Sequence, residues 1–153
     1  HYDPRCVGSC VIVSELIHAL VYGRQIPSVP AILDMAKRFD PQISEYVMMA
    51  WQEEDVNRLM NDDCIGYTLL TLSVALWAFW HAESFEDGLL KVVNAGGDAD
   101  TNAATACAIL GAKFGYSAIP EEYVEGLIYR EQLDDVIEKL SDVCLSPIGH
   151  KGI

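Results

Sequence analysis

Residues 96–101, with the sequence GGDADT, concentrate oxygen-bearing groups where one predicted helix ends and the next begins. This turn carries two carboxylates, Asp98 and Asp100, and the hydroxyl of Thr101. Mg²⁺ prefers oxygen ligands in octahedral array and usually keeps several waters, so three protein oxygens are a reasonable contribution. In a regular helix, positions 98 and 100 point about 200° apart. Convergence on one ion therefore requires Asp98 to lie in a non-helical turn, which the two preceding glycines permit.

The same residues allow other interpretations. Asp98 could be only a helix N-cap, with Asp100 a first-turn acid favoured by the helix dipole. A calcium-binding EF-hand starting at Asp98 is excluded, because Ala103 replaces the required Gly and Ile109 replaces the required Glu. A phosphatase of the D-x-D-x-T kind fits poorly, because Asn102 stands where its Thr should be.

Apolar residues recur at helical spacing along most of the chain, and no run shows the alternation of a strand. Gly23 and Gly96 are typical stop signals, and Ser84 with Asp87 has the form of a capping box. The predicted helices cover residues 7–22, 28–39, 43–60, 67–82, 84–93 and 98–114, one that begins at Pro120, and 131–143. The expected fold class is all-α, a single-domain orthogonal helical bundle over residues 1–153.

The stretch 67–82 is apolar almost all round, which predicts a central helix with little exposed surface. Trp77 and Trp80 are expected in its core. The Ala-rich helix over 98–114 contains Gly111 and is followed by Gly115, and both are small enough to let a neighbouring helix approach closely. His18 and His81, together with Cys6 and Cys10, are interpreted as structural residues and not as metal ligands.

The amino-acid composition argues against two classes of binding partner, nucleic acids and membranes. A formal net charge of −13 argues against a broad nucleic-acid surface, because such a surface needs Lys and Arg to displace counterions. Polar residues interrupt each apolar run before the roughly 18 residues of a membrane span, so no membrane partner is expected. Five cysteines without a CxxC pair favour a reducing, cytoplasmic location. The first residue is His1, and we expect the chain to be part of a longer protein.

Three segments carry a specific resemblance. The string GGDADTNAATACAILGAKFG, followed by Ala118-Ile119-Pro120, resembles the carboxy-terminal signature of the ADP-ribosylglycohydrolase family, which includes the dinitrogenase-reductase-activating glycohydrolases. The opening His1-Tyr2-Asp3-Pro4-Arg5 and the segment 66–77 resemble two further family segments in the same order.

The resemblance implies an all-helical fold with two Mg²⁺ ions that cleaves the glycosidic bond at the anomeric carbon of ADP-ribose. By position, Asp98, Asp100 and Thr101 would be metal ligands, and Asp100 would bridge both ions as the catalytic carboxylate. His1, Gly66 and Tyr67 would line the ADP-ribose cleft. Without the resemblance, Tyr67 would be assigned to the edge of the core and His1 to a frayed terminus.

The chain also departs from the family pattern. Family members have an amino-terminal Gly-Asp-Ala type segment and a Thr-Asp-Asp-Thr type segment that supply the remaining ligands, and neither occurs here. Asn61-Asp62-Asp63-Cys64 has paired acids but lacks the Thr residues and stands in the wrong order. We therefore expect this chain to be inactive without an amino-terminal half as its partner. The alternative is a non-catalytic, ADP-ribose-binding or crystallin-like structural member, and the linkage that would be cleaved stays open.

Overall fold

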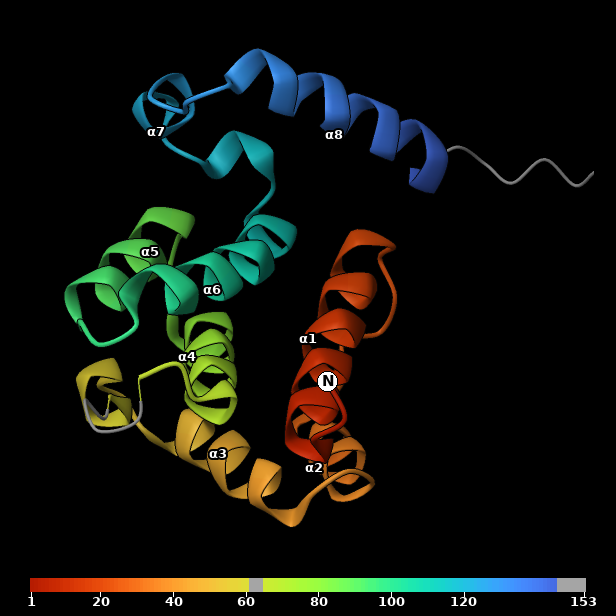
Figure 1. The fold of residues 1–153 in the computed structure, drawn as a ribbon, viewed down its shortest axis with the longest axis vertical. Helices are drawn as coiled ribbons and strands as arrows, with labels where there is room; N and C mark the ends of the chain where they lie inside the picture. The colour runs from red at the N-terminus through yellow and green to blue at the C-terminus, as the bar shows by residue number, and fades with distance from the viewer. Residues whose placement is uncertain (61–64, 146–153) are drawn as a thin grey trace, which may run out of the picture. The chain divides into compact units, whose positions relative to one another are not determined.

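A computed structural model describes residues 1–60 and 65–145. Within them it contains eight α-helices, two 3₁₀ segments and no strand, which confirms the all-α prediction (Figure 1). The elements in chain order are α1 (Pro4–Val21), α2 (Val29–Lys37), α3 (Pro41–Gln52), η1 (Val56–Leu59), α4 (Thr68–His81), α5 (Phe85–Asn94), α6 (Ala99–Phe114), η3 (Tyr116–Ala118), α7 (Glu121–Glu125) and α8 (Arg130–Leu145).

The chain divides into two compact units, His1–Ile119 and Pro120–Ile153. All of the predicted site residues belong to the first unit, which contains α1 to α6. The second unit contains α7 and α8. The expectation of one domain over residues 1–153 stays a prediction.

The core of the first unit forms around α4, as its composition predicts. This helix packs against α1, α3, α5, α6 and η1, and every residue from 72 to 79 is buried. Trp77 is 2% exposed, and its indole N–H donates to the backbone carbonyl of Glu53 at 3.1 Å. His81 stacks on the Trp77 ring and lies 3.2 Å from the Ala50 carbonyl, so its structural assignment agrees with the packing.

The third helix is shorter than the sequence predicts. It was expected to run to Met60, but α3 ends at Gln52 and Glu53 is extended, with φ −85° and ψ 128°. The Asp55 carboxylate accepts hydrogen bonds from the backbone and side-chain N–H groups of Asn57, and this starts η1 instead. A local side-chain bond to the backbone competes successfully with helix continuation here.

The close helix approach expected at Gly111 and Gly115 is not observed. A Cβ atom added at either position would meet nothing within 4 Å. Close approach occurs instead at Gly88 in α5, where a Cβ atom would lie 2.5 Å from the Leu110 side chain of α6. The small size of a glycine indicates only that another helix can approach it closely. The way in which α5 and α6 cross decides at which glycine this close approach occurs.

One helix in the described part of the chain, α1, is long and apolar enough to cross a membrane by length and composition alone. The expectation that no stretch would reach this length is therefore wrong. Its 18 residues have a mean hydropathy of 1.4, because Arg5 and Glu15 are the only residues of charged type (Asp, Glu, Lys or Arg) in it. Core helices of water-soluble proteins pass the same test, so this property is weak support for a membrane span.

Candidate functional site

The turn between α5 and α6 has the conformation that metal binding by Asp98 would require. Gly96 and Gly97 have φ values of 80° and 63°, in the region that favours glycine. Asp98 follows with φ −82° and ψ 59°, and α6 begins at Ala99. Asp98 therefore lies outside the regular helix, while Asp100 lies in its first turn.

Asp98 occupies the N-cap position of α6, but its side chain accepts no capping hydrogen bond. Its carboxylate is directed toward Gly66, where an added Cβ atom would lie 3.9 Å from Asp98 Oδ2. No ion pair to Asp98 or Asp100 occurs among residues 1–60 and 65–145. Asp98 thus stands at the position of a helix cap, but it lacks the hydrogen bond that defines a side-chain cap.

Asp100 and Thr101 are both exposed at the start of α6. Asp100 Oδ1 accepts a hydrogen bond from the Thr101 backbone N–H at 2.9 Å. In the part of the chain that the structure describes, no group of three or more His, Cys, Asp or Glu side chains is arranged to hold a metal ion. The metal-ligand roles of Asp98, Asp100 and Thr101 therefore stay predictions.

A small cavity joins the acidic turn to the head of α4. Its lining includes Gly66, Tyr67, Gly97, Asp98 and Asn102. Its volume of about 10 Å³ is close to the smallest space that holds one water molecule. The fold therefore brings Gly66 and Tyr67 together with Asp98, although about thirty residues separate them in the sequence.

Asn102 is a residue of this cavity that the sequence interpretation did not assign to the site. Its side chain is 3% exposed, and its Oδ1 atom has no hydrogen-bond partner in the described structure. Its Nδ2 group lies 4.0 Å from the Met60 sulfur, which is a weak acceptor. The sequence spacing could have indicated Asn102, because a polar residue four positions after Asp98 lies on the same side of the helix as Asp98.

Arg5 is the second residue that the sequence interpretation did not assign. Its guanidinium makes a fork to Asp3, with Nε to Oδ1 at 3.0 Å and Nη2 to Oδ2 at 2.6 Å. Its Nη1 group donates to the Tyr67 hydroxyl at 3.4 Å, and the guanidinium lies 5.9 Å from the Tyr67 ring centre. Arg5 therefore links the start of α1 to the head of α4.

These contacts shift the pKa values of Asp3 and Arg5, which together with Tyr67 form one cluster. The hydrogen bond from the Arg5 side chain, with the bond from its backbone N–H, lowers the pKa of Asp3 from 3.8 to about 2. The bond to Asp3 and the contact with Tyr67 raise the pKa of Arg5 above its usual value. The Tyr67 hydroxyl thus faces a permanent cation and not an open apolar surface.

His1 does not join the cavity at Asp98. It is exposed, its Nδ1 atom accepts weakly from the Asp3 backbone N–H at 3.4 Å, and it lines a separate cavity along α1. The ligand-binding role of His1 is untested and stays a prediction. The paired acids at Asn61-Asp62-Asp63-Cys64 lie outside the described residues. Cys6, Cys10 and Cys107 are free thiols.

Comparison with known proteins gives several related sequences. The chain is 28% identical over 147 residues to an ADP-ribosylarginine hydrolase Tri1 of Serratia proteamaculans, covering 92% of this chain and 37% of the relative. It is 36% identical to an uncharacterized protein of Archaeoglobus fulgidus, covering 94% and 48%. It is 25% identical over 127 residues to the ADP-ribosyl-[dinitrogen reductase] glycohydrolase of Rhodospirillum rubrum, covering 83% and 39%.

The chain thus spans less than half the length of these relatives. The family model described as ADP-ribosylglycohydrolase matches residues 1–148, which is nearly the whole chain. That match includes the segment at His1, the head of α4 and the acidic turn, the three places that carried the resemblance. The chain therefore belongs to the ADP-ribosylglycohydrolase family.

Proposed function

We propose that this chain is the carboxy-terminal part of a magnesium-dependent hydrolase that cleaves the glycosidic bond of ADP-ribose conjugates. Activity requires an amino-terminal segment that supplies the remaining metal ligands and an acidic residue. The observation that carries the proposal is the Asp98 carboxylate, which makes no capping bond and is held outside the helix beside Gly66, two residues before Asp100.

The available groups suit a hard cation. Asp98, Asp100 and Thr101 offer oxygen atoms alone, which is the donor chemistry that Mg²⁺ prefers. No described cation neutralises the two carboxylates, in a chain whose formal net charge is −13. The unpaired Asn102 Oδ1 nearby adds an acceptor that a bound water could satisfy. These residues therefore fit the implied metal, although they are too few to complete its coordination.

The bound Mg²⁺ ions would orient the ribose hydroxyls and stabilise charge as the glycosidic bond breaks. In this chain, Asp98, Asp100 and Thr101 would hold those ions. Tyr67 would present its ring and Arg5-bound hydroxyl to the ADP-ribose, and Gly66 would keep the wall beside Asp98 free of a side chain. In the overall reaction, a water oxygen bonds to the anomeric carbon, and the departing group takes a proton.

The first substrate to test is ADP-ribosylarginine, because two relatives carry the name ADP-ribosylarginine hydrolase. The protein to test is the complete polypeptide, with the amino-terminal half preceding His1. We expect release of free ADP-ribose that depends on added Mg²⁺ and disappears with EDTA. The 153-residue chain alone should release none, and hydrolysis by this chain alone would disprove the requirement for the amino-terminal half.

The same assay distinguishes the proposed hydrolase from the alternative, a non-catalytic member of the family. A complete protein that binds ADP-ribose in calorimetry but releases none from arginine-, serine- or nucleic-acid-linked conjugates would be a binding or crystallin-like member. A cytoplasmic location is part of the proposal, and the free thiols are compatible with it.

A further inference from the structure

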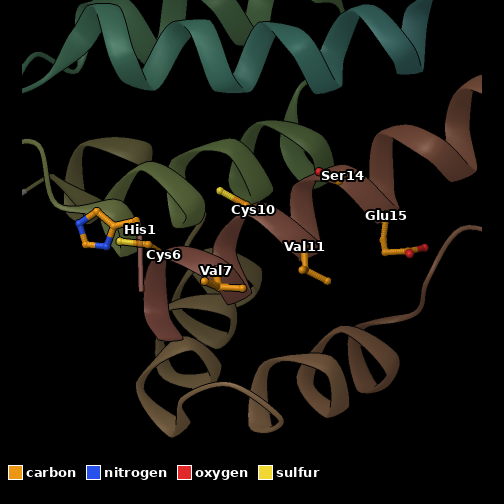
Figure 2. Close-up of a pocket in the computed structure, with 7 residues that line it drawn as sticks. All are labelled: His1, Cys6, Val7, Cys10, Val11, Ser14 and Glu15. Carbon is orange, nitrogen blue, oxygen red and sulfur yellow. The ribbon is translucent and has the colours of Figure 1, made fainter. Parts of the chain in front are cut away.

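One face of α1 is exposed along most of its length. A shallow cavity of about 380 Å³ runs along it and is lined by His1, Cys6, Val7, Cys10, Val11, Ser14 and Glu15 (Figure 2). The sequence spacing produces this face, because Cys6, Cys10 and Ser14 form one row at intervals of four, and Val7, Val11 and Glu15 form the next. These seven residues are called the α1 groove below.

The opposite face of α1 is built into the core. Ile12 and Leu16 are each 1% exposed, and Ala19 continues the same row. At Gly8, an added Cβ atom would overlap the Ile43 side chain of α3, so this side chain packs directly on the α1 backbone. The helix is therefore firmly placed, and the α1 groove is a fixed surface of the first unit.

The helix α1 is apolar in composition but only partly buried. Its mean hydropathy is 1.4, yet only 28% of its 18 residues are buried. Each Å² of apolar surface that stays exposed on such a helix forgoes about 25 cal/mol that burial would provide. Val7 is 38% exposed, and Cys10 is exposed beside it. A partner that covers this face is therefore to be expected.

The length of the relatives indicates what covers it. This chain corresponds to only 37–48% of their sequences, so more than half of each relative lies outside the matched region. We propose that the α1 groove is the docking surface for an apolar helix of the amino-terminal half of the same polypeptide. This inference rests on the proposed function, which requires that half to complete the metal site.

The position of the groove supports this occupant. His1 lies at one end of it, and Arg5 in the same stretch of α1 contacts Tyr67. Tyr67 shares the small cavity with Asp98. A segment seated in the α1 groove would therefore reach the end of the unit where ligands are missing. Ser14 and Glu15 in the lining also favour a protein partner, because a lipid bilayer would have to bury a carboxylate.

Native thiols allow a direct test. We would follow maleimide labelling of Cys10 by mass spectrometry in the 153-residue chain and in the longer polypeptide. The labelling rate of Cys10 should fall about tenfold or more in the longer polypeptide, because reaction then requires local opening. It should stay fast in the 153-residue chain at every protein concentration and with phosphatidylcholine vesicles present.

A matched pair of substitutions tests the contact itself. Val7→Glu changes the α1 groove, whereas Val93→Glu changes a valine of similar exposure, 43%, on α5 of the same unit. In the longer polypeptide, Val7→Glu should restore fast labelling of Cys10 and lower the melting temperature, and Val93→Glu should do neither. In the 153-residue chain, both substitutions should leave the melting temperature nearly unchanged.

Several results would overturn the inference. One is fast labelling of Cys10 in the longer polypeptide, and another is an equal effect of Val7→Glu and Val93→Glu there. A third is slow labelling of Cys10 in the 153-residue chain, whether in the isolated chain, at high protein concentration or with vesicles present. The proposed function fails separately: a longer polypeptide with protected Cys10 that hydrolyses nothing would retain the docking surface and lose the enzyme. A longer polypeptide that hydrolyses the substrate while Cys10 is labelled fast would retain the enzyme and lose the docking surface.

Discussion

The starts of α1 and α6 each place an aspartate at the N-cap, and the two carboxylates behave differently. Asp3 accepts from the Arg5 backbone N–H at 2.9 Å and is also paired with the Arg5 side chain. Asp98 makes neither a capping bond nor an ion pair in the described structure. Asp40 and Asp55 cap α3 and η1 as Asp3 caps α1, so Asp98 differs from three others of its kind.

The backbone explains the difference. Asp3, Asp40 and Asp55 are extended, with ψ values of 123°, 132° and 111°, whereas ψ at Asp98 is 59°. Extended backbone is the usual N-cap conformation, because it turns the side chain back over the free amides of the first turn. The two positive-φ glycines before Asp98 give it another orientation, which leaves its oxygen atoms available to a ligand.

The largest effect should come from Asp100→Asn in the complete protein. In the proposed site, loss of the negative charge of Asp100 should release at least one Mg²⁺ ion and lower hydrolysis by orders of magnitude. The fold should change little, because a first-turn acid contributes only about 0.3–1 kcal/mol. Calorimetric Mg²⁺ titration, ADP-ribose release and thermal melting would be measured together. Glu121→Gln, in the first turn of α7, is the control and should retain full turnover.

The comparison of N-caps predicts opposite outcomes for Asp98→Ala and Asp40→Ala. Asp40→Ala removes a real capping bond of 2.8 Å and should cost about 0.5–2 kcal/mol of stability without changing Mg²⁺ affinity. Asp98→Ala should cost less stability and weaken Mg²⁺ binding strongly. Chemical denaturation and calorimetry distinguish the two. Equal losses of stability with unchanged Mg²⁺ affinity would make Asp98 an ordinary cap.

Asn102→Leu should have effects of opposite sign on stability and activity. Leu has a similar size and removes a buried acceptor that has no described partner, whose burial costs about 1–3 kcal/mol. The ligand-free 153-residue chain should therefore melt at the same or a higher temperature. In the complete protein, activity should fall if Oδ1 accepts from a bound water or ligand. A more stable variant with normal activity would assign Asn102 to packing alone.

The smallest effect concerns the paired aspartate at α1. The pKa of Asp3 should be about 2 by carbon-detected NMR titration, and Arg5→Gln should raise it toward 3.8. Because the folded-state pKa is depressed, the contribution of this group to stability is present above pH 3.8 and is lost as the pH falls toward 2. An Asp3 pKa that stays near 2 in Arg5→Gln would show that another group lowers it.

Much of this could be predicted from particular residues. The apolar run 67–82 defined the central helix, and Ser84 capped α5 as its capping-box sequence predicts. The end of α3 could not be predicted, because the Asp55 cap and the Trp77 bond to Glu53 outweighed a helical pattern that continues past Gln52. Arg5 and Asn102 were missed because their importance depends on partners, or missing partners, far away in the sequence.

The sequence by itself determined the all-helical class, the family and the oxygen-bearing turn, because helical periodicity, turn glycines and motif residues are local features of the chain. Only the tertiary structure decided that Gly66 and Tyr67 lie beside Asp98 while His1 lies along α1. It also decided that Asp3 is paired and Asp98 is not. Distances between side chains from separate helices depend on how those helices pack around α4, and no local pattern specifies that packing.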